Sequence, residues 1–197
     1  MIAQNENALS PRVKEEAQRL GFELVGISPV KLPPHGESFA EWLRQGFSGR
    51  LDYMKRTEDL RRNPHRLVPW AVSLVSVGMN YCTPFSRPAA SREPKGWVSR
   101  YAWGDDYHHL IKDKLELLLD SVRRICDGPV EGKVFVDSGP VLEREFAGTA
   151  GIGWSGKNTH LISPKKGSWF FLEELFLSIP LPYVLPIRDR LGMFVFC

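Results

Sequence analysis

The sequence predicts an α/β (α+β) layered domain in which a mixed β-sheet is flanked by helices. Helical and β-rich segments alternate along most of the chain, and two further β-rich segments close it. The size points the same way, because 197 residues with 43% hydrophobic content can bury one good core. One compact domain is therefore expected.

Helices are indicated where apolar residues recur at helical spacing. A hydroxyl cap followed by proline, Ser10-Pro11, predicts a helix that starts there and stops at Gly21. The longest predicted helix spans residues 106–126, with Asp105 or Asp106 as its cap. Its expected apolar stripe consists of Leu110, Lys114, Leu117, Leu118 and Val122. Shorter helices are expected over residues 38–47, 51–64 and 140–149.

Strands are indicated by short β-rich runs between turn residues. The expected strands cover residues 22–28, 71–81 and 133–136. The second is apolar nearly throughout, so both of its faces should be covered. Two last strands, 159–163 and 167–178, are expected to form a hairpin around the polar turn between them.

Charge and cysteine content narrow the class of protein only slightly. A net charge of +3 allows a polyanionic partner without demanding one. No run of about 18 apolar residues is present, and the first residues lack the order of a signal peptide, so a cytoplasmic protein without a membrane partner is expected. The sequence has three cysteines, Cys82, Cys126 and Cys197, an odd number without a C-x-x-C pair. This pattern predicts neither a disulfide framework nor a complete metal site.

Asp137 is the first candidate for chemistry. In VFVDSGPVLERE, residues 134–145, it follows a strand and precedes a predicted helix, which is where α/β folds tend to place ligands. The same position suits a helix N-cap, and by position alone the cap is favoured. Both roles are compatible if Ser138 caps the helix while Asp137 points outward.

Two other stretches offer groups that could contact a ligand. GIGWSGKN, residues 151–158, has three glycines that let the backbone approach a ligand, and Lys157 and Asn158 add donors; a tight turn after a helix is an equally weighted alternative. The basic stretch 61–69 is either a solvated face or a clamp for phosphate or carboxamide groups. A metal site at His108 and His109 is rejected, because adjacent helical side chains point about 100° apart.

An ordered set of motifs resembles epoxyqueuosine reductase, the cobalamin and iron–sulfur family of queuosine synthesis on tRNA. The stretches that carry the resemblance are, in order, LDYMKR, RRNP, LVP, VGMNY, SRYAWGDDYH, VDSGPVLERE, AGIGWSGKN, GSWFFLEEL and IPLP. They match the family's N-terminal domain only. The resemblance implies that residues 1–182 form a cobalamin-binding domain with the fold of cobalamin-processing reductases.

The resemblance also implies the reaction and its partners. The family removes an epoxide oxygen by a two-electron reduction from a tRNA that carries epoxyqueuosine at the wobble position, and electrons pass from 4Fe-4S clusters to cobalamin and then to the substrate. Asp137 matches the family's proton donor. An aspartate with an ordinary pKa of about 3.9 is ionised at neutral pH, so this role requires surroundings that raise the pKa. An external electron donor and a monomeric chain are expected.

Residue by residue, the resemblance extends to cofactor contacts. Arg61 and Ser99 should touch the cobalamin, as should Asp137, and the strands around Leu161 and Leu172 should lie along it, largely through main chain. Lys157 and Asn158 are added on physical grounds, as donors beside exposed main-chain N–H groups.

The end of the chain departs from the family. The family continues with a C-x-x-C-x-x-C-x-x-x-C-P run that holds iron. The register places Leu191, Phe194 and Cys197 on the first three cysteine positions, so Cys197 is the one remaining metal ligand. Residues 183–197 are therefore interpreted as the remnant of a linker to a missing ferredoxin-like 4Fe-4S domain, in a truncated or altered family member.

Two other functions remain open. A non-catalytic cobalamin-binding or processing domain would bind the cofactor without using Asp137. A tRNA-binding module would use the basic patch of residues 61–66 and be indifferent to cobalamin, with an affinity that falls steeply with salt.

Overall fold

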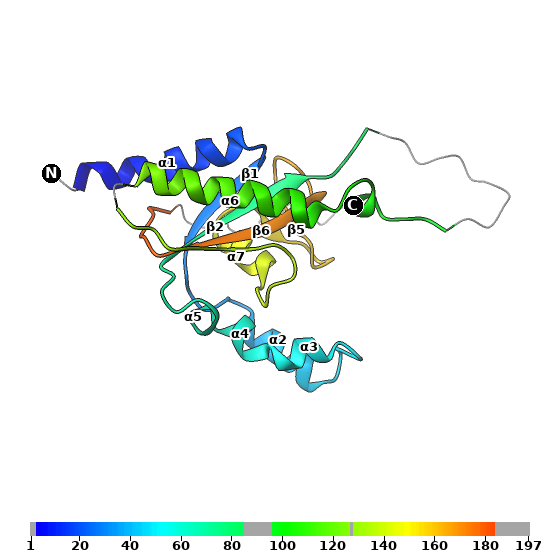
Figure 1. Cartoon of the computed structure of the whole chain (residues 1–197). Coiled ribbons are helices and arrows are strands. Elements are labelled where there is room, and N and C mark those ends of the chain that lie inside the picture. Colours follow the sequence, from blue (N-terminus) through cyan, green and yellow to red (C-terminus); the bar gives the residue numbers. More distant parts are fainter. Residues whose placement is uncertain (1–2, 85–95, 127, 184–197) are drawn as a thin grey trace.

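The computed structural model describes residues 3–84, 96–126 and 128–183, and it shows a four-stranded sheet between helices (Figure 1). The strand order is β1-β2-β6-β3, and every pairing in this sheet is antiparallel. Its strands are β1 (Leu24–Pro29), β2 (Ser73–Asn80), β3 (Gly132–Phe135) and β6 (Phe170–Leu177). The layered α/β class is confirmed. The sheet was predicted to be mixed, but all of its strand pairs are antiparallel.

Two long helices cover one face of the sheet, α1 (Ala3–Arg19) and α6 (Tyr107–Ile125) (Figure 1). Helix α6 begins as predicted, because the Asp106 side chain accepts the N–H of His108 at 2.9 Å. The side chains that α6 buries completely lie three and four residues apart, namely Ile111, Leu115, Leu118 and Val122. Each such side chain contributes roughly 1.5–3 kcal/mol by leaving water.

The predicted apolar stripe of this helix was partly wrong. Leu118 and Val122 are buried, but Leu110 and Leu117 are 52% and 53% exposed. The helix has apolar residues on more than one side, and the side that faces the sheet is the one that meets α1 and β3. Spacing alone did not distinguish the two sides.

The short helix α7 (Glu143–Thr149) packs on the opposite face of the sheet. Its end lies so close to β1 that a Cβ on Gly26 would stand 2.5 Å from the carbonyl oxygen of Ala150. The structure therefore needs glycine at position 26. Two further short strands, β4 (Trp154–Ser155) and β5 (Leu161–Ile162), pair with each other beyond this helix.

Four short helices form a separate group below the sheet in Figure 1. They are α2 (Gly36–Arg44), α3 (Asp52–Arg56), α4 (Glu58–Arg62) and α5 (Pro64–Leu67). Helices α3 and α4 replace the single helical stretch predicted over 51–64, which ends near Asn63 as expected, and α5 follows it. The final break falls where Asn63 caps α5, accepting the N–H of His65, with Pro64 at the first helical position.

Two sequence predictions about the ends of the chain were wrong, the second only in part. Helix α1 does not start at Ser10: it begins at Ala3 and continues through Pro11, while the Ser10 hydroxyl donates to the carbonyl of Pro182. The expected closing hairpin forms only at its turn, where Ser163 and Gly167 pair through two main-chain hydrogen bonds. Its strands do not pair with each other, because β5 pairs with β4 and β6 pairs with β2 and β3. Strand β6 is mostly buried and occupies an inner position in the sheet, which a hairpin edge strand could not do.

A short 3-10 turn, η1 (Arg100–Ala102), precedes α6. Among the helices that the structure describes, none combines the length and apolarity needed to cross a membrane. Leu191, Phe194 and Cys197, on which the iron–sulfur expectation rests, lie outside the described residues.

Candidate active site at the open edge of strand β6

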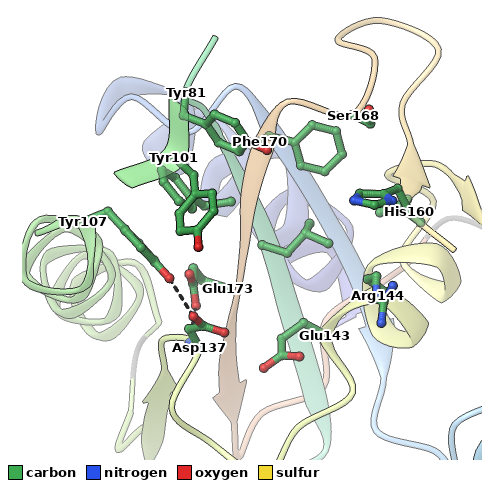
Figure 2. Close-up of a pocket in the computed structure, with 13 residues that line it drawn as sticks. Tyr81, Tyr101, Tyr107, Asp137, Glu143, Arg144, His160, Ser168, Phe170 and Glu173 are labelled. Atoms are coloured by element: carbon green, nitrogen blue, oxygen red, sulfur yellow. Dashed lines mark hydrogen bonds between the residues drawn. The ribbon is translucent and has the colours of Figure 1, made fainter. Parts of the chain in front are cut away.

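The main candidate site is a cavity of about 260 Å³ where β3 ends and β6 continues (Figure 2). Its lining brings together carboxyl groups, aromatic rings and two leucines. The lining residues are Tyr81, Tyr101, Tyr107, Asp137, Glu143, Arg144, His160, Leu161, Ser168, Phe170, Phe171, Leu172 and Glu173.

The sheet edge is open here because β3 is shorter than β6. Strand β3 pairs with β6 only between Glu174 and Leu177, whereas β2 pairs with β6 along its full length. The N–H of Tyr81 donates to the carbonyl of Trp169, and alternation along the strand then turns the main-chain groups of Leu172 away from β2. The N–H and C=O of Leu172 therefore face the open edge.

Leu161 presents its main chain in a similar way. The N–H of Gly156 donates to the carbonyl of His160 at 2.8 Å, so the neighbouring main-chain groups of Leu161 point away from β4. The Leu161 side chain is buried while the residue lines the cavity. Both leucines predicted from the family resemblance thus lie at one site.

Asp137 sits at the centre of the polar groups. Its backbone has a φ of 48°, in the left-handed region that aspartate tolerates better than most residues. Its N–H donates to Glu173 Oε2 at 2.9 Å, and its Oδ2 accepts the hydroxyl of Tyr107 at 2.6 Å. The Nε2 of His108 lies 3.5 Å from the same oxygen. The side chain is 61% exposed, so the carboxyl group is held but can be reached by a ligand.

Ser138 was expected to cap the helix while Asp137 points outward, and only the expectation for Asp137 was correct. Helix α7 starts at Glu143 and has Leu142 at its N-cap, with no capping side chain. The Ser138 hydroxyl donates to the carbonyl of Val136 instead. Neither acid nor hydroxyl caps the helix, and Asp137 is turned toward the cavity (Figure 2).

The electrostatics of the cavity favour neutral acids. Burial and the adjacent Asp137 raise the pKa of the Tyr107 hydroxyl, so this hydroxyl stays protonated and donates. Burial, together with neighbouring carboxyl groups, raises the pKa of Glu173 to about 8 and that of Glu143 to about 7, although main-chain hydrogen bonds act in the opposite direction. At neutral pH the cavity therefore holds protons on side chains that would be ionised in water.

An aromatic wall supports these groups. The ring of Tyr107 stacks on Phe171 with centroids 4.0 Å apart, and the ring centroid of Tyr81 lies 4.8 Å from that of Phe171. The wall continues into a second cavity of about 540 Å³, which shares four lining residues with the first. The second cavity is lined by Tyr81, Trp97, Ser99, Arg100, Tyr101, Asn158, His160, Ser168 and Trp169.

Most predicted contact residues line these two cavities. Asp137, Leu161 and Leu172 line the first, and Ser99 and Asn158 line the second. The loop conformation at Asn158 is held by its own side chain, which accepts the N–H of His160. These five residues come from widely separated parts of the chain.

Two predicted residues lie outside both cavity linings, and a third is not among the described residues. Arg61 donates to the carbonyl of Val141 at 2.9 Å and to Thr57, and it lines neither cavity. Lys157 is exposed and likewise outside both linings. Cys197 lies outside the described residues, so its metal-ligand role stays a prediction.

Sequence reasoning missed Glu143, Tyr107 and Glu173. The signal for Glu173 was present, because two consecutive glutamates interrupt the otherwise apolar strand FFLEELFL. Charged residues are almost never fully buried unless another group pairs with them, so a buried glutamate indicates a specific contact. Tyr107 follows directly on the capping Asp106 and carried no separate signal.

Comparison with known proteins shows which sequences this chain resembles. The family model described as "Epoxyqueuosine reductase QueG, DUF1730" matches residues 61–138. The epoxyqueuosine reductase of Pseudomonas aeruginosa is 42% identical over 183 residues, which are 92% of this chain and 50% of that protein.

Solved structures agree. An epoxyqueuosine reductase with an epoxyqueuosine-modified tRNA-Tyr stem loop superimposes with a TM-score of 0.80 and 28% identity, over 94% of this chain and 49% of that one. The Bacillus subtilis enzyme, with its catalytic aspartate loop swung out of the active site, gives a TM-score of 0.79 and 28% identity, over the same shares.

The class of protein follows from the fold, which is the layered α/β domain found in these reductases. A catabolic reductive dehalogenase has the same fold, with a TM-score of 0.55 at 14% identity over 91% of this chain and 20% of its own. Nearly the whole chain is similar to epoxyqueuosine reductases in sequence and fold. It spans about half the length of the curated relatives that it matches.

Proposed function

We propose that this chain is the cobalamin-binding part of an epoxyqueuosine reductase, and that it acts on tRNA carrying epoxyqueuosine at the wobble position. The observation that carries the proposal is the position of Asp137. Its carboxyl group is turned into a cavity beside free main-chain groups, in a chain whose relatives are epoxyqueuosine reductases. One relative was solved with such a tRNA stem loop. A tRNA substrate would place the reaction in the cytoplasm.

The proposed reaction converts an epoxide into an alkene. Both carbon–oxygen bonds of the ring break, a carbon–carbon double bond forms, and the oxygen leaves as water. The balance requires two electrons and two protons. Because an alkoxide is a very poor leaving group, the oxygen must be protonated as it departs. We assign the proton transfer to the Oδ atoms of Asp137, which Tyr107 orients through its hydroxyl group.

The residues present fit a cobalamin. A corrin ring is broad and largely apolar, and its amide arms need hydrogen-bond partners. The aromatic rings of Tyr81, Phe171 and Trp169 suit the corrin ring. The main-chain groups of Leu161 and Leu172 suit its amide arms. Ser99 and Asn158 add polar contacts in the second cavity. When bound, reduced cobalamin supplies the electrons for the reaction.

The electron supply is proposed to lie elsewhere. Among the described residues, no group of three or more histidine, cysteine or acidic side chains could hold a metal ion. On the similarity to epoxyqueuosine reductases, we assign the cobalamin-binding role to residues 1–182, and we interpret residues 183–197 as leading toward a ferredoxin-like 4Fe-4S module. We propose that this module, or an added external donor, reduces the cofactor.

The test is a titration of the 197-residue chain with cobalamin, followed by its visible spectrum. The proposal expects a saturable spectral change, and turnover of epoxyqueuosine tRNA once a strong chemical reductant is added. Asp137→Asn should bind cobalamin as the wild type does and lose turnover by roughly 100-fold or more. Asp113→Asn, an exposed position on α6, is the matched control and should keep full activity.

Three other results would each contradict the proposal in part or as a whole. Cobalamin binding with Asp137→Asn as active as wild type would refute the proton-donor role. Binding with no turnover by the wild type would point to a non-catalytic cobalamin domain. Affinity for tRNA that falls steeply with salt, without any cobalamin binding, would point to a tRNA-binding module that uses the patch of residues 61–66.

A further inference from the structure

Glu173 is a buried acid that faces Asp137. Its residue is 2% exposed, yet it lines the cavity. Its Oε2 accepts the main-chain N–H of Asp137 at 2.9 Å, and Figure 2 shows the two carboxyl groups pointing toward one another. Among the described residues, no lysine, arginine or histidine forms an ion pair with it. A buried acid without a cationic partner remains neutral more readily than an exposed one.

The next residue along the strand provides a comparison. Glu174 points to the opposite face of the sheet, where its Oε2 accepts the hydroxyl of Ser76 at 2.7 Å and its Oε1 has no partner. Both glutamates are buried. Only Glu173 contacts Asp137, so a role in proton transfer falls to Glu173.

The groups around Glu173 come from several elements. They are Asp137 after β3, Glu143 of α7, Tyr107 of α6, Tyr101 of η1 and, across the strand pair, the apolar Val77 of β2. His108 approaches Asp137 from α6 on the far side. With two neighbouring carboxyl groups and burial raising its pKa to about 8, Glu173 carries a proton at neutral pH.

The reaction needs two protons on one oxygen, while a single carboxyl group delivers one at a time. After the first transfer Asp137 is a carboxylate beside a neutral acid. We propose that Glu173 is the proton reservoir and positioning residue of Asp137: it holds the Asp137 backbone and returns a proton to the Asp137 carboxylate. This inference rests on the proposed function.

The step is balanced within the site. The O–H bond of Glu173 breaks, an O–H bond forms on Asp137, and Glu173 is left as a carboxylate. Asp137 then delivers the second proton, and the departing oxygen leaves as water. Solvent reprotonates the pair before the next turnover, so each cycle consumes two solvent protons.

The first test is a ¹³C NMR titration of the carboxyl groups in the full chain without cofactor or tRNA. Glu173 should titrate above pH 7. Asp137→Asn retains the N–H donor but removes a neighbouring carboxyl group that raises the Glu173 pKa, so it should lower the Glu173 midpoint measurably. Glu174→Gln is the matched control and should leave that midpoint unchanged. A Glu173 midpoint near 4.5, or one indifferent to Asp137→Asn, overturns the inference.

The second test is the pH dependence of turnover with added cobalamin and reductant. Glu173→Gln keeps an oxygen that can accept the Asp137 N–H but has no proton to give. Its rate should fall by about tenfold or more at pH 8 and recover toward pH 6, where solvent protons are abundant. Glu173→Asp, which restores a carboxyl group, should recover part of the loss. A Glu173→Gln profile that is parallel to wild type at every pH refutes the reservoir role.

The two hypotheses fail in different ways. A wild-type chain that binds cobalamin without turnover contradicts the proposed function. The NMR titration is performed without the cofactor, so it decides whether Glu173 shares its proton with Asp137 whatever the activity assay gives.

Discussion

Replacing Glu173 with glutamine should change how the stability of the protein depends on pH. The pKa of Glu173 is raised to about 8 in the folded chain from an ordinary value of 4.5. Between these values the folded state binds a proton that the unfolded state has lost. The free energy of unfolding therefore falls as pH rises from about 5 to 8. Below pH 4.5 the group is protonated in both states and contributes nothing to this dependence.

The size of the effect follows from the same values. At about 1.4 kcal/mol for each pH unit, a pKa that moves from 4.5 to about 8 corresponds to an upper limit of roughly 5 kcal/mol. This is comparable to the total stability of many domains, which is about 5–15 kcal/mol. Glutamine has nearly the same shape and no charge, so Glu173→Gln removes the penalty. The variant should match wild type near pH 5 and exceed it by several kcal/mol at pH 9.

Urea unfolding followed by tryptophan fluorescence at pH 5, 7 and 9 measures this difference. The six tryptophans of the chain provide the signal. Glu116→Gln removes an exposed acid on α6, 3.7 Å from Lys112, and should run parallel to wild type at all three pH values. If the stability difference between Glu173→Gln and wild type is the same at pH 5 and pH 9, then Glu173 is ionised at neutral pH and the reasoning is wrong.

Three further changes test other parts of the structure. Tyr107→Phe removes the 2.6 Å hydrogen bond to Asp137 but keeps the ring, so turnover should fall about tenfold, by roughly 1.5 kcal/mol, while urea unfolding stays within about 0.5 kcal/mol of wild type. Trp169→Ala removes an exposed ring of the second cavity and should weaken cobalamin binding at least about fivefold in a spectroscopic titration. Gly26→Ala places a Cβ 2.5 Å from the Ala150 carbonyl and should lower stability by about 1–3 kcal/mol in urea.

Local signals predicted much of the fold. The Asp106 cap was found because the cap is made by a side chain two residues from its donor. The burial of β2 on both faces followed from its apolar run. The start of α1 was misplaced because Ser10-Pro11 carries the pattern of a helix start, while its hydroxyl is used in a contact with Pro182, which lies 172 residues away. The closing hairpin was correct at its local turn and wrong in its strand pairing, because strand partners are set by contacts across the whole sheet.

The candidate site was predicted only in part. The family motifs identified Asp137, Leu161 and Leu172, which the fold brings to one cavity. They did not identify Glu173, whose importance depends on which face of β6 it occupies. A shift of one residue would have exchanged it with Glu174, which is turned away from Asp137.

The sequence by itself determined the class of the fold, its principal helices and strands, the resemblance to epoxyqueuosine reductases, and the candidate acid at the end of β3. Those properties depend on composition, spacing and short motifs, which are local. Only the tertiary structure decided that β3 stops short of β6 and leaves the main chain of Leu172 open, and that Glu173 meets the N–H of Asp137. These two features result from strand register and burial, which are set by contacts between distant parts of the chain.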